Sequence, residues 1–216
     1  MSTATVFPVI LSAPSGAGKT TIAKMLLGRR PDLGYSVSCT TRTARPGEIP
    51  GTDYYFIARA EFIAERERDG FAESAVVHGN LYGTLRREVE RVLGQGKHVV
   101  MDIDVQGAAQ FARAFPQSVT IFILPPSAEV LLDRLRARKT ESAAQLAARL
   151  QSALQELQQV GEYEYVVVND DLERAVASVG SIIDAETVSR ERVKNLRQQV
   201  ALLIERLELE IENTTP

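Results

Sequence analysis

The sequence predicts an α/β fold in which a parallel sheet is flanked by helices and joined by a small mixed β insertion. Short apolar runs alternate with helical patterns along much of the chain, and this rhythm is typical of parallel sheets covered on both faces. The stretch 35–82 interrupts it with short β-like segments and the turn-forming sequence RPGEIPG, which indicates an insertion beside the sheet. The stretch 141–159 is rich in strong helix formers and predicts a long helix.

Four apolar runs are expected to form the strands of the parallel sheet. They are 6–11, 98–101 with Ile103, 119–124 and 165–168. Helical spacing is found in 20–27, 83–93, 105–114 and 127–138. These helices fall between the strands, as the connections of a parallel sheet require.

A last helix is expected after Thr187, because apolar residues recur there at alternating spacings of three and four. The stripe consists of Val193, Leu196, Val200, Leu203 and Leu207. It could pack on its own domain or form a homo-oligomer contact, and it is too short for a secure coiled coil.

Composition limits the class of protein. The chain has 216 residues, of which 44% are hydrophobic, and this is enough to bury one full core. Lys and Arg number 25 against 28 acidic residues, so a globally basic nucleic-acid binder is not expected. One cysteine excludes an internal disulfide and fits a reducing compartment. No segment has the pattern of a signal peptide or membrane span. We therefore expect a single cytoplasmic domain with no nucleic-acid or membrane partner.

Residues 12–21 read SAPSGAGKTT and link the first strand to the first helix. They match the phosphate-loop pattern G-x-x-x-x-G-K-[ST] except at its first position, where Ala13 replaces glycine. Lys19 would reach the outer phosphates and the Thr20 hydroxyl would ligate magnesium. A plain strand-to-helix turn is the alternative, but the pattern occurs by chance in about one chain in a hundred. The expected ATP-binding residues here are Ala13, Pro14, Ser15, Gly16, Ala17, Gly18, Lys19, Thr20 and Thr21.

Two carboxylates follow the second predicted strand, in the sequence VVMDIDVQG. Asp102 and Asp104 are two residues apart and so lie on one side of an extended chain. A magnesium–phosphate site needs such a carboxylate, directly or through water. Helix capping could account for Asp104 but not for Asp102. We assign Asp102 to the metal environment, through water.

The insertion carries groups suited to a second phosphorylated substrate. Arg42 and Arg45 with Tyr54 and Tyr82 offer two guanidiniums and two phenols to a phosphate. Glu73 could accept hydrogen bonds from both N1–H and the exocyclic amine of guanine, a pair of donors that adenine lacks. The hydroxyls that could approach the same base are Ser38 and Thr84. The alternatives are a solvated turn for the arginines and a surface charge for Glu73.

Six stretches, in their order and spacing, resemble guanylate kinase from residue 6 to about 185. They are SAPSGAGKTT, SVSCTTRTARPGEIPGTDYYF, GNLYGT, MDIDVQGA, ILPPS and VVVNDDL. The resemblance implies a P-loop kinase that phosphorylates GMP, and also dGMP, with ATP and Mg²⁺ in purine nucleotide metabolism. It places Ser38, Glu73, Thr84 and Asp104 at the guanine, and Asn169 at the adenine of ATP. It places Arg42, Arg45, Tyr54 and Tyr82 at the GMP phosphate.

The resemblance also implies a helical lid that carries arginines to the transferred phosphoryl group. Arg134 and Arg138 are four residues apart, hence on one helical face, and Arg149 follows. The catalytic residues expected are Lys19, Arg42, Arg134, Arg138 and Arg149. Lys139 stands where the family commonly has glycine, which calls the flexibility of this hinge into question.

The expected organisation is one domain over 1–216. Its parts are a core (1–34, 84–133 and 160–190), a GMP-binding insertion (35–83), the lid (134–159) and a C-terminal helix (190–212).

Two other functions remain as alternatives. One is a guanylate-kinase-like interaction module without catalysis, and the other is a P-loop kinase for another small phosphate ester. A pure binding module has no need of Lys19, Thr20 and Asp102 together, and a sugar phosphate would not use the base-reading Glu73. His78 is expected to be structural or exposed, His98 is given no functional role, and Cys39 is expected to pack.

Overall fold

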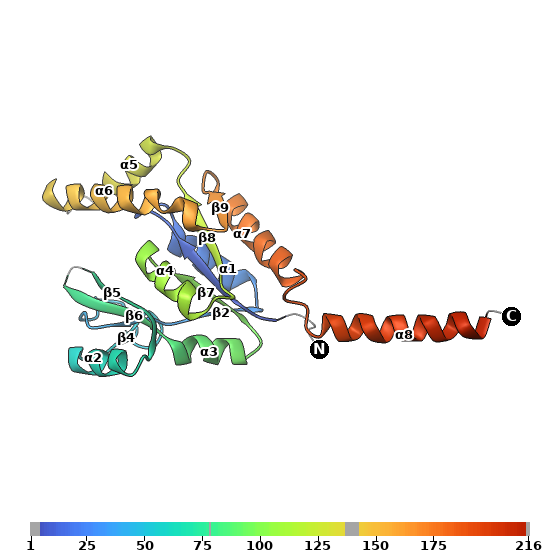
Figure 1. The fold of residues 1–216 in the computed structure, drawn as a ribbon. Coiled ribbons are helices and arrows are strands. Elements are labelled where there is room, and N and C mark those ends of the chain that lie inside the picture. The colour runs from blue at the N-terminus through green and yellow to red at the C-terminus, as the bar shows by residue number, and fades with distance from the viewer. Residues whose placement is uncertain (1–4, 78, 137–142, 215–216) are drawn as a thin grey trace.

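The structure is a computed structural model that describes residues 5–77, 79–136 and 143–214. His78, Arg138 and Lys139, which the sequence analysis singled out, lie outside these residues. Two sheets organise the chain, and a long C-terminal helix extends away from both (Figure 1).

The larger sheet has five strands in the order β2-β7-β1-β8-β9, and all neighbouring strands are parallel. The strands are β1 (Pro8–Ser12), β2 (Leu33–Tyr35), β7 (His98–Asp102), β8 (Val119–Leu124) and β9 (Tyr165–Val168). The four predicted strands are confirmed. β2 was not predicted, because its three residues, LGY, contain no apolar run.

Helices cover both faces of this sheet. Val9 and Leu11 of β1 pack with α1 (Lys19–Arg29) and α7 (Leu172–Thr187) on one face. Ile10 points to the other face, against α3 (Arg86–Gly94) and α4 (Val105–Ala114). This alternation is the period of two expected of an extended chain. The remaining helices around the core are α5 (Ala128–Arg136), α6 (Ala143–Gln158) and the short 3₁₀ helix η1 (Val160–Glu162).

The second sheet has the order β4-β3-β6-β5 and is mixed. Its strands are β3 (Cys39–Thr40), β4 (Tyr55–Phe56), β5 (Phe71–Val77) and β6 (Asn80–Leu85). The predicted helix 83–93 therefore begins three residues later, because Gly83, Thr84 and Leu85 belong to β6. The segment also contains α2 (Arg59–Glu67), which was not predicted. Phe62 of α2 is fully buried and stacks on Phe71, with ring centroids 4.3 Å apart.

The C-terminal helix α8 (Leu196–Thr214) confirms the helix expected after Thr187. Of the two roles left open for its apolar stripe, packing on the same domain is not found for Val200, Leu203 and Leu207. Residues 197–214 are all exposed. Within the described part of the chain, no helix combines the length and apolar character needed to cross a membrane.

Candidate active site

The phosphate loop joins β1 to α1, and its backbone conformation depends on two glycines. Gly16 has φ 88° and Gly18 has φ 99°, which is the left-handed region that side chains disfavour. A Cβ on Gly18 would lie 2.4 Å from Nδ2 of Asn169. That amide donates a hydrogen bond of 2.7 Å to the carbonyl of Ala17. Asn169, expected at the adenine, is thus buried against the loop and fixes its path.

Thr20 and Asp102 meet at the carboxyl ends of neighbouring strands. The Thr20 hydroxyl donates to Oδ2 of Asp102 at 2.6 Å, and the Tyr35 hydroxyl donates to Oδ1 at 2.9 Å. Burial, and next the charge of Asp102, raise the pKa of Tyr35, so this phenol stays a donor. Tyr35 is a site residue that the sequence analysis missed, because the contact spans 67 residues.

This donor set fits magnesium that arrives with a nucleotide. A hydroxyl and a carboxylate oxygen are hard ligands, and Mg²⁺ in kinases takes one or two carboxylates together with phosphates and water. Among the described residues, no group of three or more His, Cys, Asp or Glu side chains could hold a metal by itself. The geometry therefore suits a metal shared with bound phosphates.

Glu73 is a buried carboxylate in the second sheet, with 7% of its surface exposed. It lies on β5 opposite Thr84 of β6, whose hydroxyl donates to Oε1 at 2.7 Å. Ser38 continues the chain of hydroxyls, with its Oγ 3.5 Å from that of Thr84. Burial raises the pKa of Glu73 to about 7, and the Thr84 hydrogen bond only partly offsets it. The expectation that Glu73 is a surface charge is excluded by this burial.

Asp104 caps α4 by accepting a hydrogen bond of 2.7 Å from the backbone N–H of Gly107. A Cβ built on Gly107 would lie 2.9 Å from Oε2 of Glu73 and 3.4 Å from Oδ1 of Asp104. The two carboxylates thus converge at Gly107, where only a glycine leaves room for them. Ser38, Glu73, Thr84 and Asp104 are brought together as expected from the sequence.

Arg42 is the centre of a polar cluster in the insertion. It donates to the Tyr82 hydroxyl at 3.2 Å, and its guanidinium lies 5.5 Å from the centroid of the Tyr54 ring. Arg42 also forms a bidentate ion pair with Glu48, with Nη1–Oε2 and Nη2–Oε1 distances of 2.9 and 2.8 Å. The backbone N–H of Arg45 donates to the same carboxylate at 2.7 Å. The Arg42 guanidinium lowers the pKa of Glu48 to about 2, so Glu48 is an anion held where these groups converge.

The sequence analysis did not identify Glu48. The signal was available, because it is the acidic residue inside RPGEIPG, directly after the two arginines.

Two lid arginines contact the phosphate loop. Arg134 of α5 donates to the carbonyl of Ala17 at 3.4 Å, and Arg149 of α6 donates to the Ser15 hydroxyl at 3.3 Å. The carboxylate of Glu156, also on α6, accepts from the backbone N–H of Ser15 at 3.1 Å. Burial raises the pKa of Glu156. Glu156 belongs to no motif identified in the sequence. Its carboxylate thus occupies a backbone N–H of the anion-binding loop.

Comparison with known proteins agrees with this geometry. The sequence model of the family described as guanylate kinase matches residues 6–186. A guanylate kinase from Thermotoga maritima is 45% identical over 203 residues, which cover 94% of this chain and 95% of that protein. One from Rhizobium meliloti is 46% identical over 202 residues, covering 89% and 92% of the two chains.

The crystal structure of guanylate kinase from Anaplasma phagocytophilum superposes with a TM-score of 0.74 at 36% identity. The match covers 91% of this chain and 93% of that one. The likeness thus extends through both sheets and the helices around them. This chain therefore belongs to the guanylate kinase family.

Proposed function

We propose that this chain transfers the γ-phosphoryl group of ATP to GMP, and also to dGMP, with release of ADP. One observation carries the proposal: a phosphate loop follows β1 of the parallel sheet, and the buried carboxylate of Glu73, from the mixed sheet, lies against Gly107, which follows the neighbouring strand β7. A phosphate loop alone is shared by ATPases, switches and kinases. Glu73 indicates a binding site for a second substrate and favours guanine as the base of that substrate. The extension to dGMP rests on the residues assigned to GMP, which address its base and phosphate rather than its ribose.

The donor site is the phosphate loop. Its backbone N–H groups, the start of α1 and Lys19 would hold the triphosphate of ATP. Thr20, and Asp102 through water, would hold Mg²⁺, which neutralises charge on the phosphates when bound. Asn169 keeps the loop in its binding conformation through the Ala17 carbonyl.

The acceptor site is the insertion 35–83. The ionised Glu73 accepts N1–H and the exocyclic amine of guanine, while Ser38, Thr84 and Asp104 surround the base. Arg45, Tyr54 and Tyr82 hold the phosphate of GMP with Arg42. Because Arg42 is paired with Glu48 in the structure, GMP would bind by taking the place of that carboxylate on the guanidinium.

The segment 134–159 acts as the lid. Arg134, Arg138 and Arg149 supply positive charge where the transferred group spreads its negative charge, and closure excludes water. Phosphoryl transfer needs alignment and electrostatic stabilisation rather than covalent help from the protein. A cytoplasmic location is consistent with this chemistry and with the free, buried thiol of Cys39.

The test is the release of ADP, followed in a coupled assay with ATP and magnesium and with GMP, dGMP, AMP, CMP or UMP as acceptor. We expect release that depends on GMP or dGMP and that is abolished by EDTA. Release with AMP or a pyrimidine nucleotide but not with GMP would overturn the assignment of the base.

A further inference from the structure

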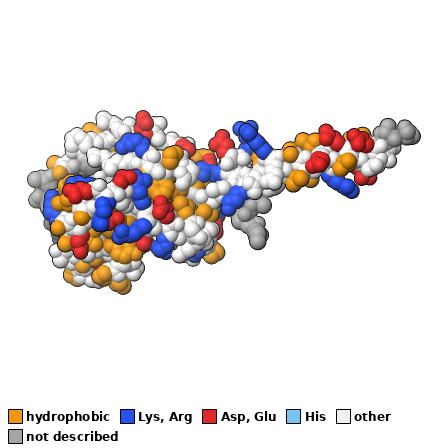
Figure 2. Space-filling model, turned by 60° about the horizontal axis from the view of Figure 1, so that its bottom comes forward, with side chains coloured by type: hydrophobic (Ala, Val, Ile, Leu, Met, Phe, Trp, Pro, Cys, Tyr) orange, Lys and Arg blue, Asp and Glu red, His pale blue; other side chains and the backbone are white. Residues whose placement is uncertain are grey.

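Helix α8 leaves a long apolar surface open to solvent. Its large aliphatic side chains expose between 43% and 65% of their surface. They are Val200, Leu202, Leu203, Ile204, Leu207, Leu209 and Ile211. Figure 2 shows apolar side chains along the projecting helix, with acidic ones toward its far end. A monomeric protein rarely leaves a contiguous apolar patch above a few hundred Å² uncovered, so this surface calls for a partner.

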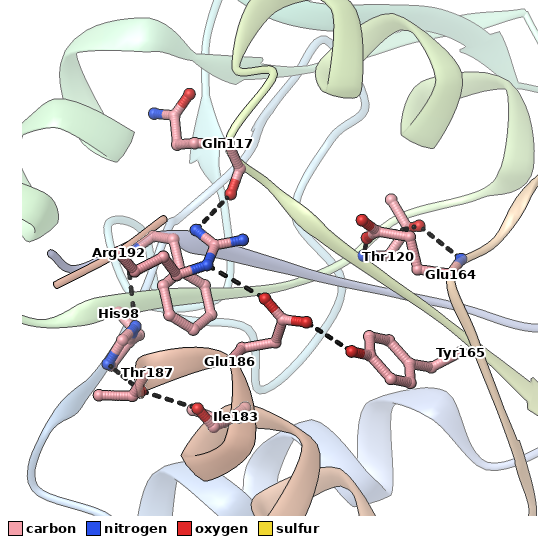
Figure 3. A network of polar contacts seen from close by, with 10 residues as sticks. His98, Gln117, Thr120, Glu164, Tyr165, Ile183, Glu186, Thr187 and Arg192 are labelled. Carbon is pink, nitrogen blue, oxygen red and sulfur yellow. Dashed lines mark hydrogen bonds and ion pairs between the residues drawn. The ribbon is translucent and has the colours of Figure 1, made fainter. Parts of the chain in front are cut away.

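The segment that leads into α8 is anchored to the domain through Arg192, four residues before the helix begins. Arg192 lies 4.0 Å from the centroid of the Phe7 ring. Its guanidinium donates to Glu186 at 3.1 Å and to the carbonyl of Gln117 at 2.9 Å (Figure 3). The backbone N–H of Thr5 donates to the Arg192 carbonyl at 2.9 Å. This junction connects the segment 190–197, which we call the root of α8, to three separate parts of the domain.

The charge on this segment changes sign along its length. Near the root, Arg190, Lys194 and Arg197 outnumber Glu191. In the outer half the excess is acidic. Its charged residues are Glu205, Arg206, Glu208, Glu210 and Glu212. A parallel pair of such helices would place like charges together at both ends, whereas an antiparallel pair places acidic tips beside basic roots.

We propose that α8 pairs antiparallel with α8 of a second copy of this chain, in a two-fold symmetric dimer. A groove of about 770 Å³ at the root has both the chemistry and the place that a partner's tip requires. Its charged lining is two arginines, Arg190 and Arg197, and one glutamate, Glu191, and its apolar lining includes Val193, Leu196, Val200 and Ile204. Leu207 and Ile211 of the second copy seat in it, with the neighbouring glutamates beside the arginines. Two-fold symmetry repeats this contact at both ends of the helix pair.

A second copy fits this surface better than a membrane does. Amphipathic helices that lie on membranes carry a basic polar face, whereas the outer half of α8 is acidic. The apolar face also has the spacing that helix pairing requires, because Val200, Leu203, Leu207 and Ile211 recur at intervals of three and four and lie on one side of α8.

The dimer leaves both active sites open. The root of α8 contacts Phe7, Gln117 and Glu186, and Glu186 accepts from Tyr165, the first residue of β9. These contacts lie at the amino-terminal ends of the strands, whereas Asp102 and Asn169 lie at the carboxyl ends. Dimerisation should therefore change mass without changing catalysis.

Sedimentation velocity of the full chain over a range of concentrations tests the association. We expect a species of twice the 23.7 kDa protomer mass, which Leu203→Glu together with Leu207→Glu converts to monomer while GMP-dependent ADP release is retained. Val76→Glu is the matched control, because Val76 on β5 is 65% exposed and Leu203 is 64% exposed, and it should leave the dimer intact. A parent that is monomeric at every concentration, or a dimer that survives the double substitution, would overturn the proposal.

The orientation is tested with a spin label on Asn213→Cys, since the natural Cys39 is buried. An antiparallel pair separates the two labels by roughly 30 Å, given the rise of 1.5 Å per residue. A pulsed electron–electron distance below about half of that value, as in a parallel pair, would reject the antiparallel arrangement even if a dimer forms.

Discussion

A buried carboxyl group can accept hydrogen bonds from both donors of guanine only while it is ionised, and the pKa of Glu73 lies close to neutral pH. Its pKa of about 7 results from burial, so near neutral pH the free enzyme holds Glu73 partly protonated. GMP binding must therefore draw the proton away. This one side chain links base recognition to the pH of the solution.

Glu73→Gln should lower kcat/KM for GMP about a hundredfold, because a buried amide donor facing the donors of guanine loses hydrogen bonds worth roughly 1–3 kcal/mol each. KM for ATP should change less than twofold. Coupled ADP release measures both. Glu88→Gln is the control, since Glu88 is also buried but pairs with Arg91 on α3. Equal GMP activity of parent and Glu73→Gln would contradict the role of Glu73.

The pKa of Glu73 also predicts a pH dependence with a defined sign. KM for GMP should rise about eightfold between pH 7.5 and pH 6 as the carboxyl, with its pKa of about 7, takes up a proton. Glu73→Gln should remove this rise and leave only the titration of the GMP phosphate.

The raised pKa of Glu73 also means that the folded state binds this proton more tightly than the unfolded state. The free energy of unfolding should thus fall by up to roughly 3 kcal/mol between pH 4.5 and pH 8 in the parent relative to Glu73→Gln. Urea unfolding of both proteins at pH 4.5 and pH 8 measures this change. An equal change in the parent and in Glu73→Gln would contradict the prediction.

At the scale of single elements, the phosphate loop works because β1, two glycines and α1 are joined without side chains in the way. Gly18→Ala should cost roughly 1–3 kcal/mol of stability, since it forces alanine into a left-handed conformation, and should raise KM for ATP strongly by displacing Asn169. Gly28→Ala in α1 is the matched control. A Cβ there meets nothing within 4 Å, and alanine should stabilise the helix by about 0.5–1 kcal/mol. Thermal unfolding and ATP kinetics compare the pair, and a harmless Gly18→Ala would disprove the account of this loop.

The proposed lid carries arginines on two helices, Arg134 on α5 and Arg149 on α6. Arg138→Ala should lower kcat about a hundredfold with little change in KM for GMP, by analogy with arginine fingers. Arg136→Ala is the control, because Arg136 is an exposed arginine at the end of α5, and we expect less than a twofold effect. Single-turnover rates should separate the two variants. Near-normal turnover after Arg138→Ala would reject the assignment of this arginine.

At the scale of the whole molecule, Arg192 joins the start of the chain, the sheet and the root of α8. Arg192→Ala should lower the free energy of unfolding by about 2 kcal/mol, because it leaves the mostly buried Glu186 without its ion pair. Arg174→Ala removes the exposed pair with Asp170 and should cost less than about 0.5 kcal/mol. Urea unfolding measures both variants. Equal losses would show that the junction does not stabilise the fold.

The sequence by itself determined four of the five strands of the parallel sheet and the phosphate loop, and it led to the residues proposed at both substrates, because these depend on local patterns. An apolar run, a glycine bend before a helix and a short motif can be read from a few adjacent residues. The burial of Glu73 and the convergence of Asp102 with Thr20 then agree with what those patterns implied.

Only the tertiary structure decided what depends on distant contacts. The ion pair of Arg42 with Glu48 and the contact of Glu156 with Ser15 follow from how the chain folds back on itself. The helices α2 and α8 show two ways in which local patterns fall short: one helix was missed, and the other was predicted without its packing partner. α2 has a single buried residue, Phe62, which is too few for a helical stripe. The stripe of α8 is clear, but its periodicity reports only that one face is apolar and not what covers it.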